Sequence, residues 1–234
     1  IGISGKKQSG KNTVALIWQY LYDKAQTGYK HPDSLDDFNS YIKNQHHLNS
    51  YYIQKSFANK LKQIVCLLIG CSMEQLEDNI FKETPLDKLW WKYNLPPYET
   101  DGGIDYLKAC ELFGEEELLE KYIVRTSPRL LLQLLGTQCG REIIHPNIWV
   151  NALFSEYVSY HNSRVNIYTL PKWIISDVRF ENEAKAIKER NGIIIRVNRN
   201  SENKDNHQSE IDLDNYKEFD YTIANIGSIK DLIE

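Results

Sequence analysis

Hydrophobic residues along the chain gather in two alternating kinds of segment. Short apolar runs, which are typical of strands buried on both faces, occur at residues 1–3, 172–176 and 193–197, and residues 51–56 and 221–224 are strand-like because they are rich in aromatic and branched residues. Between them, apolar residues recur at helical spacing, in segments that begin near Val14, Leu61, Leu130, Val150 and Ala184. Strands that alternate with helices predict an α/β fold, in which helices flank a mostly parallel sheet.

Three stretches lack these patterns. Residues 27–50 are polar and predict a loop or a peripheral helix. Residues 72–124 are acidic and aromatic, and they predict a helical insert that forms either one wall of a substrate site or a dimer surface. The polar residues 199–210 are a candidate lid. We expect one domain over residues 1–234 that contains both the insert and the lid.

The first apolar run leads into a glycine-rich loop, Ser4-Gly5-Lys6-Lys7-Gln8-Ser9-Gly10-Lys11-Asn12-Thr13, and then into a helix. A strand, a loop and a helix in this order are the context of a phosphate-binding P-loop. Gly5 and Gly10 let backbone N–H groups turn toward an anion, and the helix adds the positive end of its dipole. Lys11 would reach the β- and γ-phosphates, and Thr13 would offer a hydroxyl to phosphate or Mg²⁺.

One detail of this loop departs from the common P-loop pattern, which has Ser or Thr directly after the lysine. Here that position is Asn12, and the hydroxyl follows at Thr13. The spacing Gly-Lys-x-Thr resembles that of nucleoside monophosphate kinases. The alternative is a surface turn that is rich in Gly and Lys by accident. The motif indicates a nucleotide phosphate without indicating the reaction.

Residues 129–141 form the second informative stretch. At about 100° per residue, one face carries Leu130, Leu131, Leu134 and Leu135, and the other carries Arg129, Gln133, Gly136, Thr137 and Gly140. Glycine in a helix costs about 1 kcal/mol relative to Ala, so small residues on this face indicate close approach by a ligand or by another helix. We favour the ligand because an Arg and a Gln share the face.

Five residues lie at or just beyond the carboxyl ends of the expected strands: Gly5, Ser56, Asp177, Asn200 and Asn225. In open parallel sheets, ligands bind beyond the carboxyl ends of the strands. The sequence therefore predicts a ligand site at this edge of the sheet.

Composition narrows the class of protein. Of 234 residues, 41% are hydrophobic and 26% charged, as in a soluble globular protein, and the net charge of −4 predicts no general attraction to nucleic acid or to an anionic membrane. The longest apolar run, residues 64–69, is too short to span a bilayer. No basic leader is evident, so we expect a cytoplasmic protein. Its four cysteines lack the spacing of a zinc site, and we expect them to be reduced thiols.

Motifs spread in order over nearly the whole chain resemble those of the deoxynucleoside monophosphate kinases of tailed bacteriophages. They are Ser4-Gly5-x-x-x-Ser9-Gly10-Lys11-x-Thr13, Phe57-Ala58-x-x-Leu61-Lys62, Pro128-Arg129 through Gln133, Gly136-Thr137, Gly140-Arg141, Ile148-Trp149-Val150, Asp177-Val178-Arg179-Phe180-x-Asn182-Glu183-Ala184, His207-x-Ser209-Glu210 and Asn225-x-Gly227-Ser228. Residues 72–122 match this family poorly, and there substrate preference could differ.

The resemblance implies transfer of the γ-phosphoryl group of ATP to a 5′-deoxynucleoside monophosphate, with Mg²⁺, a core like that of adenylate kinase, and a homodimer. It implies an ATP site of Gly5, Lys7, Ser9, Gly10, Lys11, Asn12, Thr13, Asn225 and Gly227. The implied acceptor site comprises Phe57, Lys62, Arg129, Gln133, Gly136, Thr137, Arg141 and Trp149. Lys11, Arg129, Arg141, Asp177 and Arg179 are the expected catalytic residues, Thr13 and Asp177 would hold Mg²⁺ partly through water, and Arg199 is an optional charge donor from the lid.

Each assignment has an alternative. Arg129 could pair with a carboxylate of the insert, Asp177 could cap the helix that begins at Phe180, and Phe57 and Trp149 could be core residues. His207 is more simply a polar surface residue than a base. The whole chain could instead be a P-loop kinase for another small phosphorylated acceptor, such as phosphomevalonate or dephospho-coenzyme A, or a non-catalytic nucleotide-binding module. A GTPase is disfavoured because Asp-x-x-Gly and Asn-Lys-x-Asp are absent from the sequence.

Overall fold

The computed structural model describes residues 1–27, 34–44, 50–93, 123–162, 167–199 and 212–233. The chain divides into two compact units, which are described separately below. Residues 1–60 and 145–234 form the first unit, and residues 61–144 form the second.

A five-stranded sheet, in the order β2-β7-β1-β8-β9, is the centre of the first unit. Its strands are β1 (Gly2–Ser4), β2 (Ile53–Lys55), β7 (Trp173–Val178), β8 (Ile194–Asn198) and β9 (Tyr221–Ala224). Every pairing is parallel, with Gly2 opposite both Ile175 and Ile194. The expectation of a mostly parallel sheet is confirmed, and all five carboxyl ends meet at one edge.

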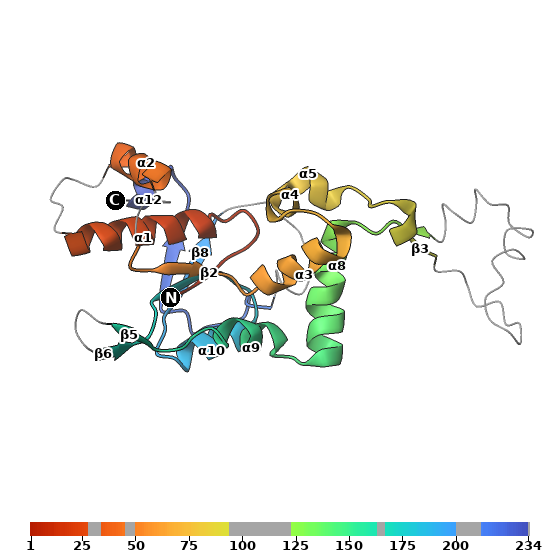
Figure 1. Ribbon diagram of the computed structural model, residues 1–234. Helices are drawn as coiled ribbons and strands as arrows, with labels where there is room; N and C mark the ends of the chain where they lie inside the picture. The colour runs from red at the N-terminus through yellow and green to blue at the C-terminus, as the bar shows by residue number, and fades with distance from the viewer. Residues whose placement is uncertain (28–33, 45–49, 94–122, 163–166, 200–211, 234) are drawn as a thin grey trace, which may run out of the picture. The chain divides into compact units, whose positions relative to one another are not determined.

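Helices cover both faces of this sheet (Figure 1). They are α1 (Lys11–Thr27), α2 (Leu35–Asn44), α9 (Ile148–Phe154), α10 (Glu181–Lys188) and α12 (Ile229–Ile233). On one face, Leu153 of α9 and Ile187 of α10 share a cluster with Trp173 and Ile175. On the other, Val14 of α1 packs with Ile174. Successive residues of β7 thus enter opposite layers, as the alternation of a strand requires.

The polar stretch before β2 contains a peripheral helix, one of the two forms expected for it. Phe38 of α2 is 1% exposed, and its ring meets that of Tyr20 of α1 edge to face, with centroids 5.6 Å apart. Burial of an aromatic ring of this size contributes about 1.5–3 kcal/mol. The helix is therefore held to the sheet layer through α1.

Short helices make up much of the described part of the second unit. They are α3 (Asn59–Ile69), which begins in the first unit, α4 (Met73–Glu77), α5 (Asn79–Glu83), η2 (Lys88–Trp90), α8 (Pro128–Gln133) and η3 (Leu134–Ile144). A short antiparallel pair joins β3 (Lys92–Tyr93) to β4 (Ile123–Val124). Local capping explains why the helices start where they do. Ser72, Asp78, Asp87 and Ser127 each accept a backbone N–H with the side chain.

Three features differ from the sequence-based expectation. The helix expected over residues 129–141 is α-helical only to Gln133, and η3 continues it as a π-helix. Helical spacing of Val150, Leu153, Phe154, Tyr157 and Val158 predicts a buried stripe on one helix, but the helix that begins at Ile148 ends at Phe154, and Val158 beyond it is 62% exposed. A hairpin of β5 (Tyr160–Asn162) and β6 (Ile167–Thr169) precedes β7, where no element was predicted.

Other predictions fall wholly or partly outside the described residues. Much of the insert, residues 94–122, and all of the candidate lid except Arg199 lie there. The insert and lid boundaries, and the single domain, stay predictions. Among the described residues, no helix is both long and apolar enough to cross a bilayer.

Candidate functional site

The glycine-rich loop leaves the central strand β1 and enters α1, as the sequence predicts. Lys11, the first residue of α1, is only 9% exposed. Its Nζ donates hydrogen bonds to the carbonyl oxygens of Gly5 (2.6 Å) and Lys6 (2.7 Å). The ammonium group therefore lies across the loop, held by the same backbone that would surround a phosphate.

The loop closes around a buried hydroxyl. Ser9 is 1% exposed, and its Oγ has no hydrogen-bond partner among the described residues. A Cβ atom on Gly5 would lie 2.4 Å from this Oγ and 2.5 Å from the carbonyl oxygen of Val197, so only glycine fits there. An unsatisfied buried hydroxyl is costly, and a phosphate oxygen is an acceptor that would satisfy it. The interior of the loop therefore fits an anionic ligand.

Asn225, directly after β9, supports this loop from a neighbouring strand. Its side chain is 5% exposed, and Nδ2 donates to the carbonyl oxygen of Ser9 at 2.8 Å. Its backbone N–H donates to the carbonyl of Asn198 at 2.7 Å. A Cβ on Gly10, whose φ is +93°, would lie 2.4 Å from Asn225 Nδ2. The role of Asn225 in ATP binding, which the resemblance implies, stays a prediction, and the structure shows its amide buried against the loop.

The carboxylate of Asp177, in β7, binds the turn between β2 and α3. Its Oδ2 accepts from Ser56 Oγ (2.6 Å) and from the N–H of Ala58 (2.9 Å), and its Oδ1 accepts from the N–H of Phe57 (2.9 Å). The alternative that it caps the helix after Phe180 is not what the structure shows. The carboxylate instead fixes the start of α3 at the carboxyl edge of the sheet.

Glu183 caps α10, a role that was not predicted for it from the motif in which it lies. It is 1% exposed, and its Oε2 accepts the backbone N–H groups of Arg179 (2.8 Å) and Phe180 (3.1 Å). A carboxylate at a helix N-terminus satisfies free N–H groups and interacts favourably with the helix dipole. This contact sets the backbone that carries Arg179 directly after β7. A Glu three residues into the expected helix was the sequence signal for it.

A charged network next to the loop was also missed. Asp214 pairs with Lys6 of the loop, and its Oδ1 lies 3.4 Å from a guanidinium nitrogen of Arg196. Arg196 NH1 donates to Ser4 Oγ at 3.0 Å. Asp214 follows a polar stretch without periodicity, so nothing local in the sequence places it near the loop.

Within the second unit, two expected acceptor residues form ion pairs. Arg129 Nε lies 2.9 Å from Glu83 Oε1, as one of the alternatives stated, and Lys62 Nζ lies 2.5 Å from Glu77 Oε1. A Cβ on Gly136 would lie 2.9 Å from Leu61 Cδ2 of α3, so the body close to Gly136 is another helix. Thr137 and Gly140 are buried beside it on η3, whereas Gln133 and Arg141 are partly exposed.

The remaining predicted residues are distributed over the first unit. Phe57 is 3% exposed and meets Phe154 edge to face, and Trp149 is 6% exposed; both agree with the core alternative. Gly227 lies against Asp231, which accepts the backbone N–H of Ser228 at the start of α12 (2.6 Å). Asn12 is exposed, and Lys7 and Thr13 are partly exposed. His207 lies outside the described residues.

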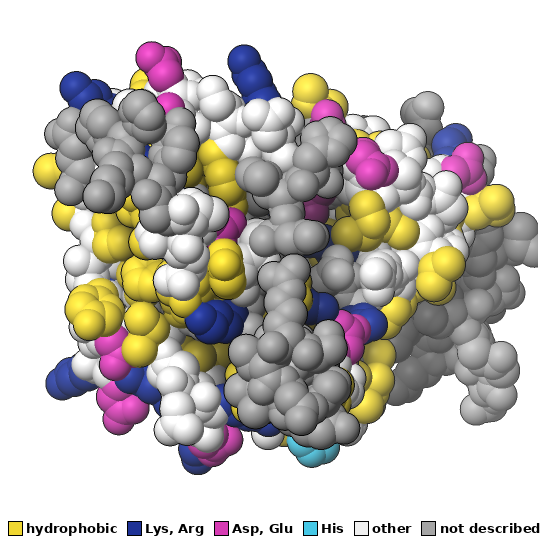
Figure 2. All heavy atoms as spheres, turned by 60° about the vertical axis from the view of Figure 1, so that its left-hand side comes forward, with side chains coloured by type: hydrophobic (Ala, Val, Ile, Leu, Met, Phe, Trp, Pro, Cys, Tyr) yellow, Lys and Arg dark blue, Asp and Glu magenta, His cyan; other side chains and the backbone are white. Residues whose placement is uncertain are grey.

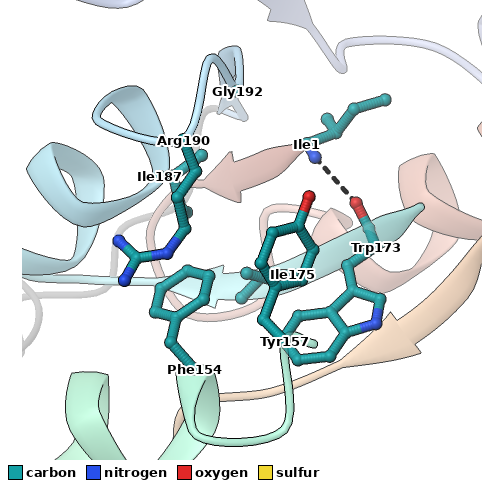
Figure 3. Close-up of a pocket in the computed structure, with 8 residues that line it drawn as sticks. All are labelled: Ile1, Phe154, Tyr157, Trp173, Ile175, Ile187, Arg190 and Gly192. Atoms are coloured by element: carbon teal, nitrogen blue, oxygen red, sulfur yellow. Dashed lines mark hydrogen bonds between the residues drawn. The ribbon is translucent and has the colours of Figure 1, made fainter. Parts of the chain in front are cut away.

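A cavity also lies at the opposite ends of the strands, beside Ile1 and Trp173 (Figure 3). The rings of Phe154 and Tyr157 and the guanidinium of Arg190 line it, with Arg190 Cζ 4.0 Å from the centre of the Phe154 ring. Its interior of about 50 Å³ holds a few waters but no nucleotide. Among the described residues, the loop edge is therefore the better nucleotide site.

Charged side chains of both signs are interspersed over the face in Figure 2. Among the described residues, Lys55 forms an ion pair with Glu156, and Lys188 forms one with Asp220.

The sheet order, with a glycine loop between the central strand and α1, defines a P-loop α/β protein of the nucleoside monophosphate kinase type. The family model "Deoxynucleotide monophosphate kinase" matches residues 72–234, more than half of the chain. The chain belongs to this family, which confirms the resemblance drawn from its motifs.

Two curated relatives agree. The deoxynucleoside-5′-monophosphate kinase of Escherichia phage T5 is 26% identical over 210 residues, which cover 82% of this chain and 72% of the relative. A protein of Acanthamoeba polyphaga mimivirus named "Putative deoxynucleotide monophosphate kinase" is 28% identical over 236 positions, covering 99% of this chain and 90% of the relative. The glycine loop, which precedes the family match, lies within that second alignment.

Proposed function

We propose that the chain transfers the γ-phosphoryl group of ATP to a 5′-deoxynucleoside monophosphate, giving ADP and the deoxynucleoside diphosphate. An oxygen of the acceptor phosphate attacks the γ-phosphorus, and the bond to the β–γ bridging oxygen breaks. Such a transfer needs two anions aligned and their charge neutralised, with little covalent help. Membership in the deoxynucleotide monophosphate kinase family supports the acceptor class.

The observation that best supports ATP binding at the loop is the position of Lys11 Nζ, which lies across the loop and 2.6 Å from the carbonyl oxygen of Gly5. In the proposed complex this ammonium exchanges carbonyl oxygens for the β- and γ-phosphate oxygens of ATP. The buried Ser9 Oγ supplies a hydroxyl donor, and the N-terminus of α1 supplies N–H groups to the same anion. The loop thus supplies both charge and hydrogen-bond donors.

Acceptor binding is proposed for the second unit. Arg129 and Arg141 would hold the acceptor phosphate, since a guanidinium binds phosphate with two N–H groups at once. Gln133 would read a base edge with its amide. The ion pair between Arg129 and Glu83 orients the guanidinium, and an exposed pair of this kind is worth only about 0–1 kcal/mol. A phosphate with two charges would therefore displace Glu83 at small cost.

Mg²⁺ is the metal that this reaction requires, and the available donors are oxygens, which this ion prefers. Asp177 uses three of about four carboxylate lone pairs on the turn that begins at Ser56. It fits a role through water better than direct coordination, and Thr13 offers a hydroxyl from α1. When bound with ATP, Mg²⁺ neutralises charge on the β- and γ-phosphates. The dimer and the cytoplasmic location expected from the sequence stay predictions.

An acceptor screen tests this function. The purified protein is incubated with ATP, Mg²⁺ and each deoxynucleoside monophosphate in turn, with the ribonucleotides alongside, and ADP formation is followed. Turnover with one or a few deoxynucleotides is expected. ATP binding without turnover on any of them would contradict the proposal, and phosphorylated metabolites of other classes would then be screened.

A further inference from the structure

Two thiols lie side by side where α3 ends, in a part of the second unit that the proposed reaction does not use. Cys71 Sγ is 3.8 Å from Cys66 Sγ, and Cys66 Sγ is 3.6 Å from Met73 Sδ. Cys66 and Cys71 are both partly exposed free cysteines. Three sulfur atoms are thus in contact within eight residues of sequence.

The local backbone brings the thiols together. Gly70 directly follows α3 and has a φ of +69°, and the N–H of Cys71 donates to the carbonyl of Cys66 at 3.2 Å. A left-handed glycine and this six-to-one hydrogen bond define the Schellman motif, in which the two bonded residues also touch through their side chains. In most proteins that contact is hydrophobic. Here the two positions are both cysteines.

We propose that Cys66 and Cys71 are a modification site, at which a peroxide oxidises the two thiols to an intramolecular disulfide that a dithiol reductant opens again. A disulfide has a sulfur separation of about 2.03–2.05 Å, so the sulfurs must approach by roughly 1.8 Å from their present 3.8 Å. The hydrogen bond between the two residues already holds their backbones together.

The two sulfurs have different roles. Burial and the neighbouring Cys66 raise the pKa of the Cys71 thiol, so Cys71 keeps its proton and directs its S–H at Cys66 Sγ. Cys66 is therefore the sulfur that attacks first. The sulfur of Cys66 attacks one oxygen of hydrogen peroxide, the O–O bond breaks, and the other oxygen leaves as water. Cys66 thereby becomes a sulfenic acid. Cys71 then attacks this sulfur and the S–O bond breaks. In sum, two thiols lose two electrons and two protons, and the peroxide becomes two waters.

Mass spectrometry of the full chain tests the proposal. The protein is reduced, freed of reductant, treated with hydrogen peroxide, alkylated with N-ethylmaleimide and digested. We expect Cys66 and Cys71 to lose alkylation together, in a linked peptide that is lighter by two hydrogens. The rate should not change when the protein is diluted, and dithiothreitol should restore both thiols. Cys139 is the internal comparison, since it is also a partly exposed free thiol.

Two serine variants separate the proposal from general oxidation. Cys71→Ser should stop Cys66 at the sulfenic acid, which a dimedone probe captures, and Cys139→Ser should leave disulfide formation unchanged. The proposal is overturned if Cys66 and Cys71 stay alkylated while Cys139 is oxidised. It is equally overturned if dimedone captures Cys66 in the wild type to the same extent as in Cys71→Ser, or if the disulfides formed join other cysteines or two copies of the chain.

Discussion

Replacing Asn225 with Ala tests whether the glycine loop depends on support from β9. The change removes the hydrogen bond from Nδ2 to the carbonyl oxygen of Ser9, which is 2.8 Å long and buried. A buried acceptor that loses its partner costs about 1–3 kcal/mol, and we expect the free energy of unfolding to fall by that amount. If the conformation of the loop that binds ATP is destabilised by one or two of these kcal/mol relative to other loop conformations, its population falls about 5- to 30-fold.

The kinetic consequence is specific to one substrate. The KM for ATP should rise within that range, whereas the KM for the deoxynucleoside monophosphate should change little. Urea unfolding and initial rates at varied ATP measure the two effects, and Asn225→Asp, which loses the donor and sets a carboxylate oxygen against the carbonyl oxygen of Ser9, should be at least as damaging as Asn225→Ala. Asn191→Gly is the control substitution: Asn191 has a φ of 56°, which glycine adopts readily, so this change should produce neither effect. An unchanged free energy of unfolding, or an equal rise in both KM values, would refute this account of Asn225.

Three further predictions concern the second unit and the surface. Arg129→Ala should raise the acceptor KM or lower kcat far more than it alters the KM for ATP. If Glu83→Ala gives the same kinetics, the ion pair with Glu83 is the only role of Arg129. Gln133→Ala should reorder the preference among bases, unlike the exposed Gln138→Ala, and a uniform loss for all acceptors would exclude base reading. Glu156 has its pKa lowered to about 2 by Lys55 and Lys60. The folded-state pKa lies below the usual 4.5, so the ionised carboxylate stabilises the fold above pH 4.5 and this stabilisation vanishes as the pH falls toward 2. Glu156→Gln should therefore lower the free energy of unfolding by about 0.2–1 kcal/mol above pH 4.5 only. A loss for Glu156→Gln that does not depend on pH, or that the control Glu189→Gln shows equally, would contradict this.

Local signals were enough to predict the elements that form the nucleotide edge. The run from β1 through the glycine loop into α1 depends on glycine geometry and helical spacing within a few residues. The parallel sheet followed from the alternation of strands with helices. These features are properties of neighbouring residues, so a single sequence contains them.

Partners far apart in the sequence could not be predicted in this way. Asn225 meets Ser9 across 216 residues, and Asp177 meets Ser56 across 121. Such contacts are set by the order of strands in the sheet, which periodicity does not encode. The π-helix was missed for a related reason, because the pattern over residues 129–141 was read with the α-helical angle. The small buried face of η3 then proved to lie, at Gly136, against Leu61 of a neighbouring helix.

The most direct test of the proposed function follows the phosphoryl group itself. Wild-type protein, Lys11→Ala and the control Lys185→Ala, which changes an exposed lysine of α10, are each given ATP labelled at the γ-phosphate, Mg²⁺ and a deoxynucleoside monophosphate. We expect label in the deoxynucleoside diphosphate for the wild type and Lys185→Ala, and none for a folded Lys11→Ala. Label that appears in inorganic phosphate alone, or undiminished transfer by Lys11→Ala, would contradict it.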